Sequence, residues 1–283
     1  MRKPCEDIFN SGTWESFEFE GRAAGIVRPL HPDRHGSWAI YTEYFGAFPG
    51  VAEALLLHGF HIVKLENENR WGTQNDVEAR LRFADALERK RGLSHRCVTI
   101  GMSCGGLHAI KFAARHPDRV SAMYLDAPVV NLLSCPMGLG QGERDEATVR
   151  ECLDALSLTE TEMLGYREHP LDDIPALVKA RIPMALVYGA ADRAVPFEEN
   201  GALLAKAYRE ADIPLFLMGK PGCGHHPHGL EEPTPILEFL LKHTSRKTGS
   251  PSSGLQEDSR KDASSRQGAS AGKSRPFWNL EGA

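Results

Sequence analysis

The sequence has no apolar run of the roughly 18 residues that a membrane-spanning helix requires. Its first residues, 1–7, also lack the apolar core of a secretory signal peptide. The six cysteines, at positions 5, 97, 104, 135, 152 and 223, show no paired spacing. We therefore expect a cytoplasmic protein whose cysteines are small buried thiols, with no disulfide bonds and no membrane partner.

The chain also lacks a basic stripe of the kind that binds nucleic acid. Its formal net charge is −5, and the residues from Arg246 onward hold more basic than acidic groups, so the part before Arg246 is more acidic still. Such a charge distribution argues against nucleic acids and anionic membranes as partners. With 41% hydrophobic and 25% charged residues, the composition is that of an ordinary globular protein.

Strand-like and helix-like segments alternate along most of the chain. Period-two patterning in residues 14–20 and 23–28, around Gly21, predicts an opening antiparallel hairpin. Further strands are predicted at 37–42, 60–65, 96–100, 120–125, 183–189 and 214–218, and helices at 51–57, 76–91, 107–116, 197–211 and 233–243. This alternation predicts an α/β protein with a mostly parallel, eight-stranded sheet and helices on both faces.

Two segments interrupt this alternation. Residues 131–173 contain Pro136, several glycines and a helical stretch at 143–156, and we expect them to form a small cap over the edge of the sheet within a domain of residues 1–245. Residues 246–283 form a low-complexity tail that we expect to be disordered, because its first 28 residues have almost no apolar side chains to bury. Its end, Pro276-Phe277-Trp278, fits a docking peptide or, more simply, a tail without a function.

Residues 101–106, Gly-Met-Ser-Cys-Gly-Gly, lie between a predicted strand and a predicted helix. Gly-x-Ser-x-Gly in that context is typical of a nucleophile elbow, a sharp turn that exposes the Ser103 hydroxyl. Gly101 and Gly105 would remove clashes between the turn and its neighbouring elements. The spacing alone also fits a Gly-rich turn in another α/β protein, so the interpretation needs an acid and a histidine further along the chain.

Both partners follow later strands. Asp192 comes just after the strand at 184–188, and His225, His226 and His228 come after the strand at 215–218. The carboxyl ends of parallel strands meet at one edge of the sheet, where ligands bind. Three histidines in four positions also suit a metal, but the loop is rich in Gly and Pro and has no carboxylate or cysteine at ligand spacing. We therefore favour a histidine general base and predict no metal and no cofactor.

The order Ser, acid, His resembles the α/β-hydrolase fold family over about residues 14–243. The resemblance rests on residues 101–106, on Asp192-Arg193-Ala194-Val195-Pro196 and on Gly222-Cys223-Gly224-His225. It implies that Ser103 is the nucleophile, Asp192 the orienting acid and His225 the base of an acyl-transfer reaction to water. His226 is the less suitable base, because in the family the catalytic histidine usually follows the glycine directly.

By the same resemblance, the backbone N–H of Cys104 is one oxyanion donor, and Tyr44 or Phe45 supplies the second from the loop after Thr42. Many family members have a His-Gly pair in this loop, whereas this chain has Glu43-Tyr44-Phe45-Gly46. Cys104 is disfavoured as a nucleophile because it begins the helix, and Asp126 is expected to have a structural role.

The substrate prediction rests on the loop at 66–72. Trp71 can stack on a sugar ring, and Arg70, beside Asn69, can bind a carboxylate, although the loop also fits a solvated segment anchored by one tryptophan. Glu43 and His226 are the other candidate substrate-binding residues. Residues 224–230 resemble a bacterial branch of predicted esterases, some of which act on esterified carbohydrates.

This second resemblance implies a serine-dependent carboxylic ester hydrolase acting on a small-molecule or oligosaccharide ester, such as an acetyl or methyl ester. A thioesterase, a lipase, a peptidase and a non-catalytic binding protein remain alternatives, because one fold hosts many activities. The mixed composition of the cap disfavours a lipase, and the absence of a visible second domain or amine-anchoring glutamate pair disfavours a peptidase. A complete set of Ser, Asp and His disfavours a protein that has lost catalysis. The oligomeric state is left open.

Overall fold

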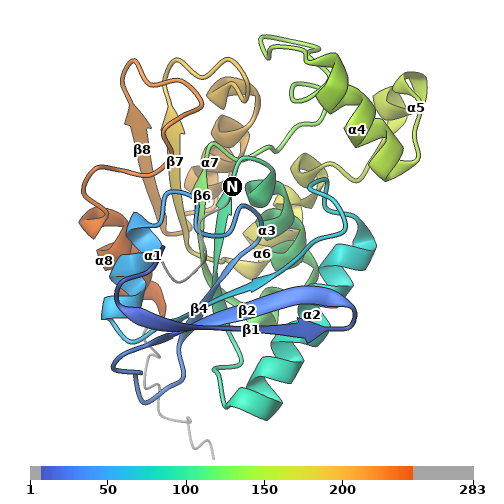
Figure 1. Cartoon of the computed structure of the whole chain (residues 1–283). Coiled ribbons are helices and arrows are strands. Elements are labelled where there is room, and N and C mark those ends of the chain that lie inside the picture. Colours follow the sequence, from blue (N-terminus) through green and yellow to red (C-terminus); the bar gives the residue numbers. More distant parts are fainter. Residues whose placement is uncertain (1–7, 245–283) are drawn as a thin grey trace, which may run out of the picture. The chain divides into compact units, whose positions relative to one another are not determined.

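The computed structural model describes residues 8–244, and its centre is one eight-stranded sheet (Figure 1). The strand order is β1-β2-β4-β3-β5-β6-β7-β8. The strands are β1 (Gly12–Phe19), β2 (Arg22–Pro29), β3 (Trp38–Tyr41), β4 (His61–Leu65), β5 (Cys97–Met102), β6 (Val120–Asp126), β7 (Met184–Gly189) and β8 (Leu215–Lys220). β1 and β2 form the predicted antiparallel hairpin, β2 pairs antiparallel with β4, and all later neighbours are parallel. This is the α/β-hydrolase fold, as the sequence predicted.

Helices cover both faces of the sheet because successive side chains of each central strand point to opposite faces. Val98, Ile100 and Met102 of β5 pack with α1 (Gly50–Leu57) and α8 (Thr234–Thr244). Cys97 belongs to the cluster on the other face, under α2 (Gln74–Arg91), α3 (Cys104–Arg115), α6 (Ile174–Ala180) and α7 (Gly201–Glu210). Figure 1 shows α1 beside α8, and α3 beside α6 on the opposite side of the sheet.

The insertion at 131–173 contains α4 (Glu146–Leu156) and α5 (Glu160–Gly165), which Figure 1 shows set apart from the sheet. Each begins at a capped residue: Asp145 accepts from the Thr148 N–H at 2.8 Å, and Thr159 and Glu162 form a capping box. Val149 and Met163 pack in a third apolar cluster with residues of the sheet domain, among them Trp71 and Leu107. The insertion therefore shares a core with the loop at 66–72 and the start of α3.

Three helical details differ from the sequence predictions. The helix expected at 197–211 is a 3-10 turn, Phe197–Glu199, followed by α7. Asn200 separates them because its buried side chain accepts the N–H groups of Val130 and Asn131 at 2.9 and 3.0 Å, which fixes the start of the insertion. The short helices α5 and α6 were not predicted.

Some predictions concern residues that the structure does not describe. The disordered tail at 246–283, its Pro276-Phe277-Trp278 end and the N-terminal residues 1–7 lie outside the described range. Within residues 8–244, no helix is both long enough and apolar enough to cross a bilayer.

Candidate active site

Ser103 occupies the sharp turn between β5 and α3. Its φ of 52° and ψ of −122° form a combination that L-residues rarely adopt, at a cost on the order of 1–3 kcal/mol. Two backbone hydrogen bonds hold the turn against the end of β6: the Ser103 N–H donates to the Asp126 carbonyl, and the Ser103 carbonyl accepts from the Val129 N–H, both at 3.0 Å. The strained conformation is therefore imposed by the neighbouring strand.

Glycines make this turn sterically possible. A Cβ on Gly101 would lie 2.6 Å from the carbonyl oxygen of Gly105, and one on Gly105 would lie 3.3 Å from the Cβ of Glu43. A Cβ on Gly106 would overlap the Cβ of Pro128. Sequence reasoning identified Gly101 and Gly105, and the structure adds Gly106 as a third position where the turn excludes a side chain.

The structure brings Ser103, His225 and Asp192 together from three separate loops. The Ser103 hydroxyl donates to Nε2 of His225 at 3.1 Å, and Nδ1–H of His225 donates to Oδ2 of Asp192 at 2.7 Å. The Asp192 side chain is 1% exposed, and its other oxygen accepts the N–H groups of Ala194 and Val195 at 2.9 Å each. A buried, fully hydrogen-bonded carboxylate fixes the imidazole tautomer that leaves Nε2 free to accept a proton.

The Cys104 N–H is placed to stabilise negative charge beside Ser103. Cys104 is the first residue of α3, and the N–H groups of a first helical turn have no carbonyl partner in their own helix. Tyr44, at φ 53°, packs against the apolar cluster that contains Cys104. The Phe45 ring instead packs against Phe9, Trp14 and Tyr41.

The thiol of Cys104 is poorly suited to act as a nucleophile. Cys104 is 4% exposed, and burial raises the pKa of its thiol to about 11. The reactive form of cysteine is the thiolate, so Cys104 is protonated and inert near neutral pH. Its contribution to the site is its backbone N–H.

A cavity of about 660 Å³ lies at the carboxyl ends of β3 and β4. It is lined by the loop after β3, the loop after β4 and α4, and its polar side chains include Glu43, Tyr44, Asn67, Arg70 and Glu151. The Glu43 carboxylate accepts from Nδ2 of Asn67 at 2.7 Å, and the Cβ and backbone nitrogen of Glu43 lie against Gly105. The predicted substrate-binding residues Glu43, Asn69 and Arg70 therefore border one cavity, whereas Ser103 and His225 are not among the residues that line it.

Trp71 does not have the role expected of it. It is 1% exposed and packs in the core beneath the insertion, so neither face of its ring is available to a sugar. Its indole N–H donates to Glu151 at 3.2 Å, while Arg70 forms two hydrogen bonds to the same carboxylate at 2.8 and 2.6 Å. Asn69 Oδ1 accepts the Trp71 N–H at 2.8 Å. The stacking hypothesis is wrong, and the loop anchors α4.

The two remaining histidines lie beside His225. The exposed His226 ring stacks on Phe48, with centroids 5.8 Å apart. His228 is buried, and its Nδ1–H donates to Asp126 at 2.8 Å. Asp126 therefore has a partner 102 residues away that sequence reasoning did not assign, although Asp126 and His228 both follow predicted strands.

A model of the prolyl oligopeptidase family matches residues 65–247, well over half of the chain. Several solved structures share the fold. Dipeptidyl peptidase 4 of Porphyromonas gingivalis is 18% identical with a TM-score of 0.64 over 83% of this chain. A puromycin hydrolase is 20% identical, and a puromycin-hydrolyzing peptidase of Mycobacterium tuberculosis is 16% identical, each with a TM-score of 0.62 over 81% of this chain.

These three proteins are much longer than the matched region. The chain covers 36% of the length of the dipeptidyl peptidase and 38% of each of the other two. At such low identity, the structural matches support a shared fold and leave open what this chain acts on.

Proposed function

The chain belongs to the prolyl oligopeptidase family, and we propose that it is a serine hydrolase whose first candidate substrate is a peptide-like amide. The observation that carries the proposal is the hydrogen-bonded series Ser103–His225–Asp192 beside a free helix N-terminus. These are the groups that acyl transfer requires: a nucleophile, a base, a group that orients the base and a donor to the oxyanion.

In the proposed reaction, His225 takes the proton of Ser103 as the hydroxyl attacks the substrate carbonyl. The Cys104 N–H and a second donor from Tyr44 or Phe45 stabilise the resulting oxyanion, and each such donor typically lowers the barrier by about 3 kcal/mol. His225 then delivers its proton to the leaving group, and an acyl-enzyme forms on Ser103. Water, activated by His225, releases the acid, while Asp192 holds the ring and balances its charge throughout.

We propose that the substrate binds in the cavity that Glu43 borders, because Glu43 also lies against Gly105 of the turn that holds Ser103. One oxygen of Glu43 bonds to Asn67, and within residues 8–244 the other has no hydrogen-bond partner. Glu43 is therefore available to accept a donor of the substrate, such as an ammonium or amide group. Arg70 and Glu151 are already paired with one another, so we propose that they shape the cavity and do not bind a charged group of the substrate.

Ester cleavage is the second candidate. The same nucleophile, base and oxyanion donors hydrolyse esters, whose leaving groups depart without prior protonation more readily than amines do. The matched family and the compared structures are named as peptidases and a puromycin hydrolase, and they give no support to the predicted carbohydrate ester. A thioesterase and a non-catalytic homologue remain alternatives for the same site.

A substrate panel tests the proposal. Aminoacyl and dipeptidyl arylamides are compared with short and long p-nitrophenyl esters, acyl thioesters and acetylated oligosaccharides, each with wild type and Ser103→Ala. We expect arylamide hydrolysis that Ser103→Ala abolishes. Activity on esters alone, or on thioesters alone, would identify that group as the substrate class in place of amides. Activity that Ser103→Ala retains, or no turnover of any substrate, would contradict the proposed hydrolase.

A further inference from the structure

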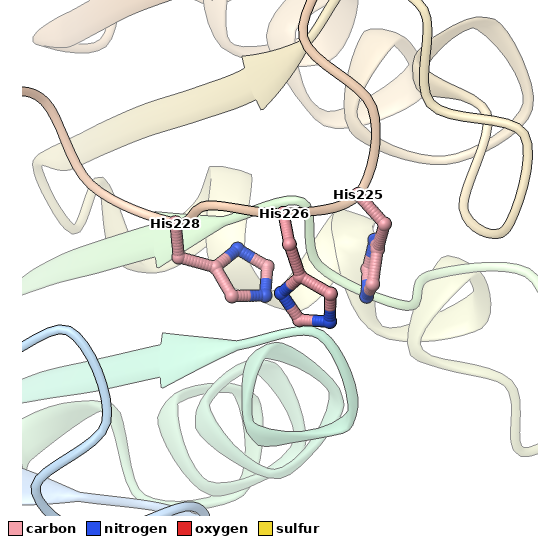
Figure 2. Close-up of side chains that lie close together, drawn as sticks. All are labelled: His225, His226 and His228. Carbon is pink, nitrogen blue, oxygen red and sulfur yellow. The ribbon is translucent and has the colours of Figure 1, made fainter.

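Three imidazoles gather on the same side of the loop that follows β8. Figure 2 shows the rings of His228, His226 and His225 side by side, projecting from the same side of that loop. Each ring offers one ligand nitrogen, and these atoms all lie within 4.8 Å of one another. The ring centroids are 4.9–5.0 Å apart in pairs. The proposed hydrolysis uses only His225, which leaves the clustering of the other two unexplained.

Two of these rings are oriented by buried carboxylates. His225 donates Nδ1–H to Asp192 at 2.7 Å, and His228 donates Nδ1–H to Asp126 at 2.8 Å. Both carboxylate side chains are 1% exposed. An imidazole that donates one N–H to a carboxylate keeps the lone pair on its other nitrogen, which is the usual arrangement of a zinc-binding histidine. The carboxylates come from the ends of β6 and β7, so the spacing within the loop could not reveal them.

The third ring is accessible from solvent. Within residues 8–244, the His226 side chain has ring contacts with Phe48 and the two neighbouring histidines but no hydrogen-bond partner. Both of its nitrogens are therefore available to a ligand. Imidazole suits zinc and similar borderline divalent cations, and neutral ligands do not need to lose a proton on binding.

We propose that His225, His226 and His228 bind one zinc ion, with water at the fourth position of a tetrahedral site. Zinc–nitrogen bonds of about 2.0–2.1 Å place the three nitrogens about 3.4 Å apart, so the rings must close in from their present separation. His226 is the ring with room to move, because it is exposed whereas His228 is buried.

Bound zinc and the proposed catalysis exclude one another. Nε2 of His225 accepts the Ser103 hydroxyl at 3.1 Å, and the same lone pair would bind the ion. Zinc binding therefore removes the acceptor that Ser103 needs, without any proton or electron being transferred. The site would make the enzyme reversibly sensitive to zinc. The inhibitory effect rests on the proposed function, whereas the binding of zinc does not.

Calorimetric titration of the chelator-treated, untagged full chain with Zn²⁺ tests the binding directly. His226→Phe keeps a ring against Phe48 and removes both nitrogens, and His31→Ala removes an exposed histidine from another loop. We expect one zinc ion per chain in wild type and in His31→Ala, and at least about tenfold weaker binding in His226→Phe. No saturable binding, or equal affinity in wild type and His226→Phe, would overturn the proposed site.

Labelling of Ser103 by a fluorophosphonate tests the coupling. Zinc should slow labelling of wild type and His31→Ala, EDTA should restore it, and His226→Phe should need at least about tenfold more zinc for the same effect. If zinc binds through His226 but does not slow labelling, the proposal that bound zinc and catalysis exclude one another is wrong. Absence of labelling without zinc would instead refute the proposed hydrolase, and the calorimetry would still decide whether the metal site exists.

Discussion

At the scale of single residues, the site depends on a backbone conformation that side chains disfavour. Ser103 has φ 52°, and residues 101, 105 and 106 are all glycine because a Cβ at each would press on a neighbouring group: the start of the helix, Glu43 and Pro128, respectively. This is why the turn could be identified from sequence: its chemistry and its steric demands fall within six consecutive residues.

Gly101→Ala tests this steric account. The added Cβ would lie 2.6 Å from a backbone carbonyl oxygen, which cannot turn aside as a flexible side chain can. We expect a loss of about 1–3 kcal/mol in the free energy of unfolding, measured by urea denaturation. Gly165→Ala is the matched control, because a Cβ there meets nothing within 4 Å, and it should change stability by less than about 0.5 kcal/mol. Equal stability of the two variants would contradict the account.

At the scale of elements, Glu151 of α4 makes one of the contacts that join the insertion to the sheet domain. Glu151 accepts two hydrogen bonds from Arg70 and one from the Trp71 indole, so the loop after β4 and α4 form two walls of the same cavity. The position of α4 therefore determines the shape of the proposed substrate site.

Glu151→Gln should weaken this attachment. The Arg70 and Glu151 side chains are 33% and 47% exposed, so solvent screens the pair and its loss should cost about 0.5–1 kcal/mol. If substrate binds only when α4 is docked, KM should rise about two- to fivefold, while kcat changes little. Glu146→Gln, on the same helix but paired with Arg144 within the insertion, is the matched control and should leave KM unchanged. A KM that rises equally in both variants would show that the docking contact is not the cause.

Secondary-structure elements were predicted correctly from the sequence where nearby residues determine them, and incorrectly where tertiary contacts determine them. The eight strands follow from their own apolar patterns. Asn200 interrupts the helix predicted at 197–211 because it binds backbone groups of Val130 and Asn131, which are about 70 residues distant. Trp71, within the predicted loop at 66–72, was interpreted as able to stack on a sugar, whereas the packing of the insertion buries it.

At the scale of the whole molecule, parallel strand order explains why distant residues meet. β5, β6 and β7 are consecutive neighbours in the sheet, and β8 pairs with β7, so the loops that hold Ser103, Asp126, Asp192 and His225 leave the same edge. The sequence could place each residue after a strand. The family resemblance assigned Asp192 to His225, but the pairing of Asp126 with His228 was not predicted, because it depends on the path of the loop after β8.

The most direct test of the account is the rate at which a fluorophosphonate modifies the protein, with the modified residue mapped by mass spectrometry. We predict modification of Ser103 in wild type and a rate at least about a hundredfold lower in His225→Ala, because the base that activates the hydroxyl is gone. Modification of another residue, or an unchanged rate in His225→Ala, would contradict the assignment of Ser103 and His225 as nucleophile and base.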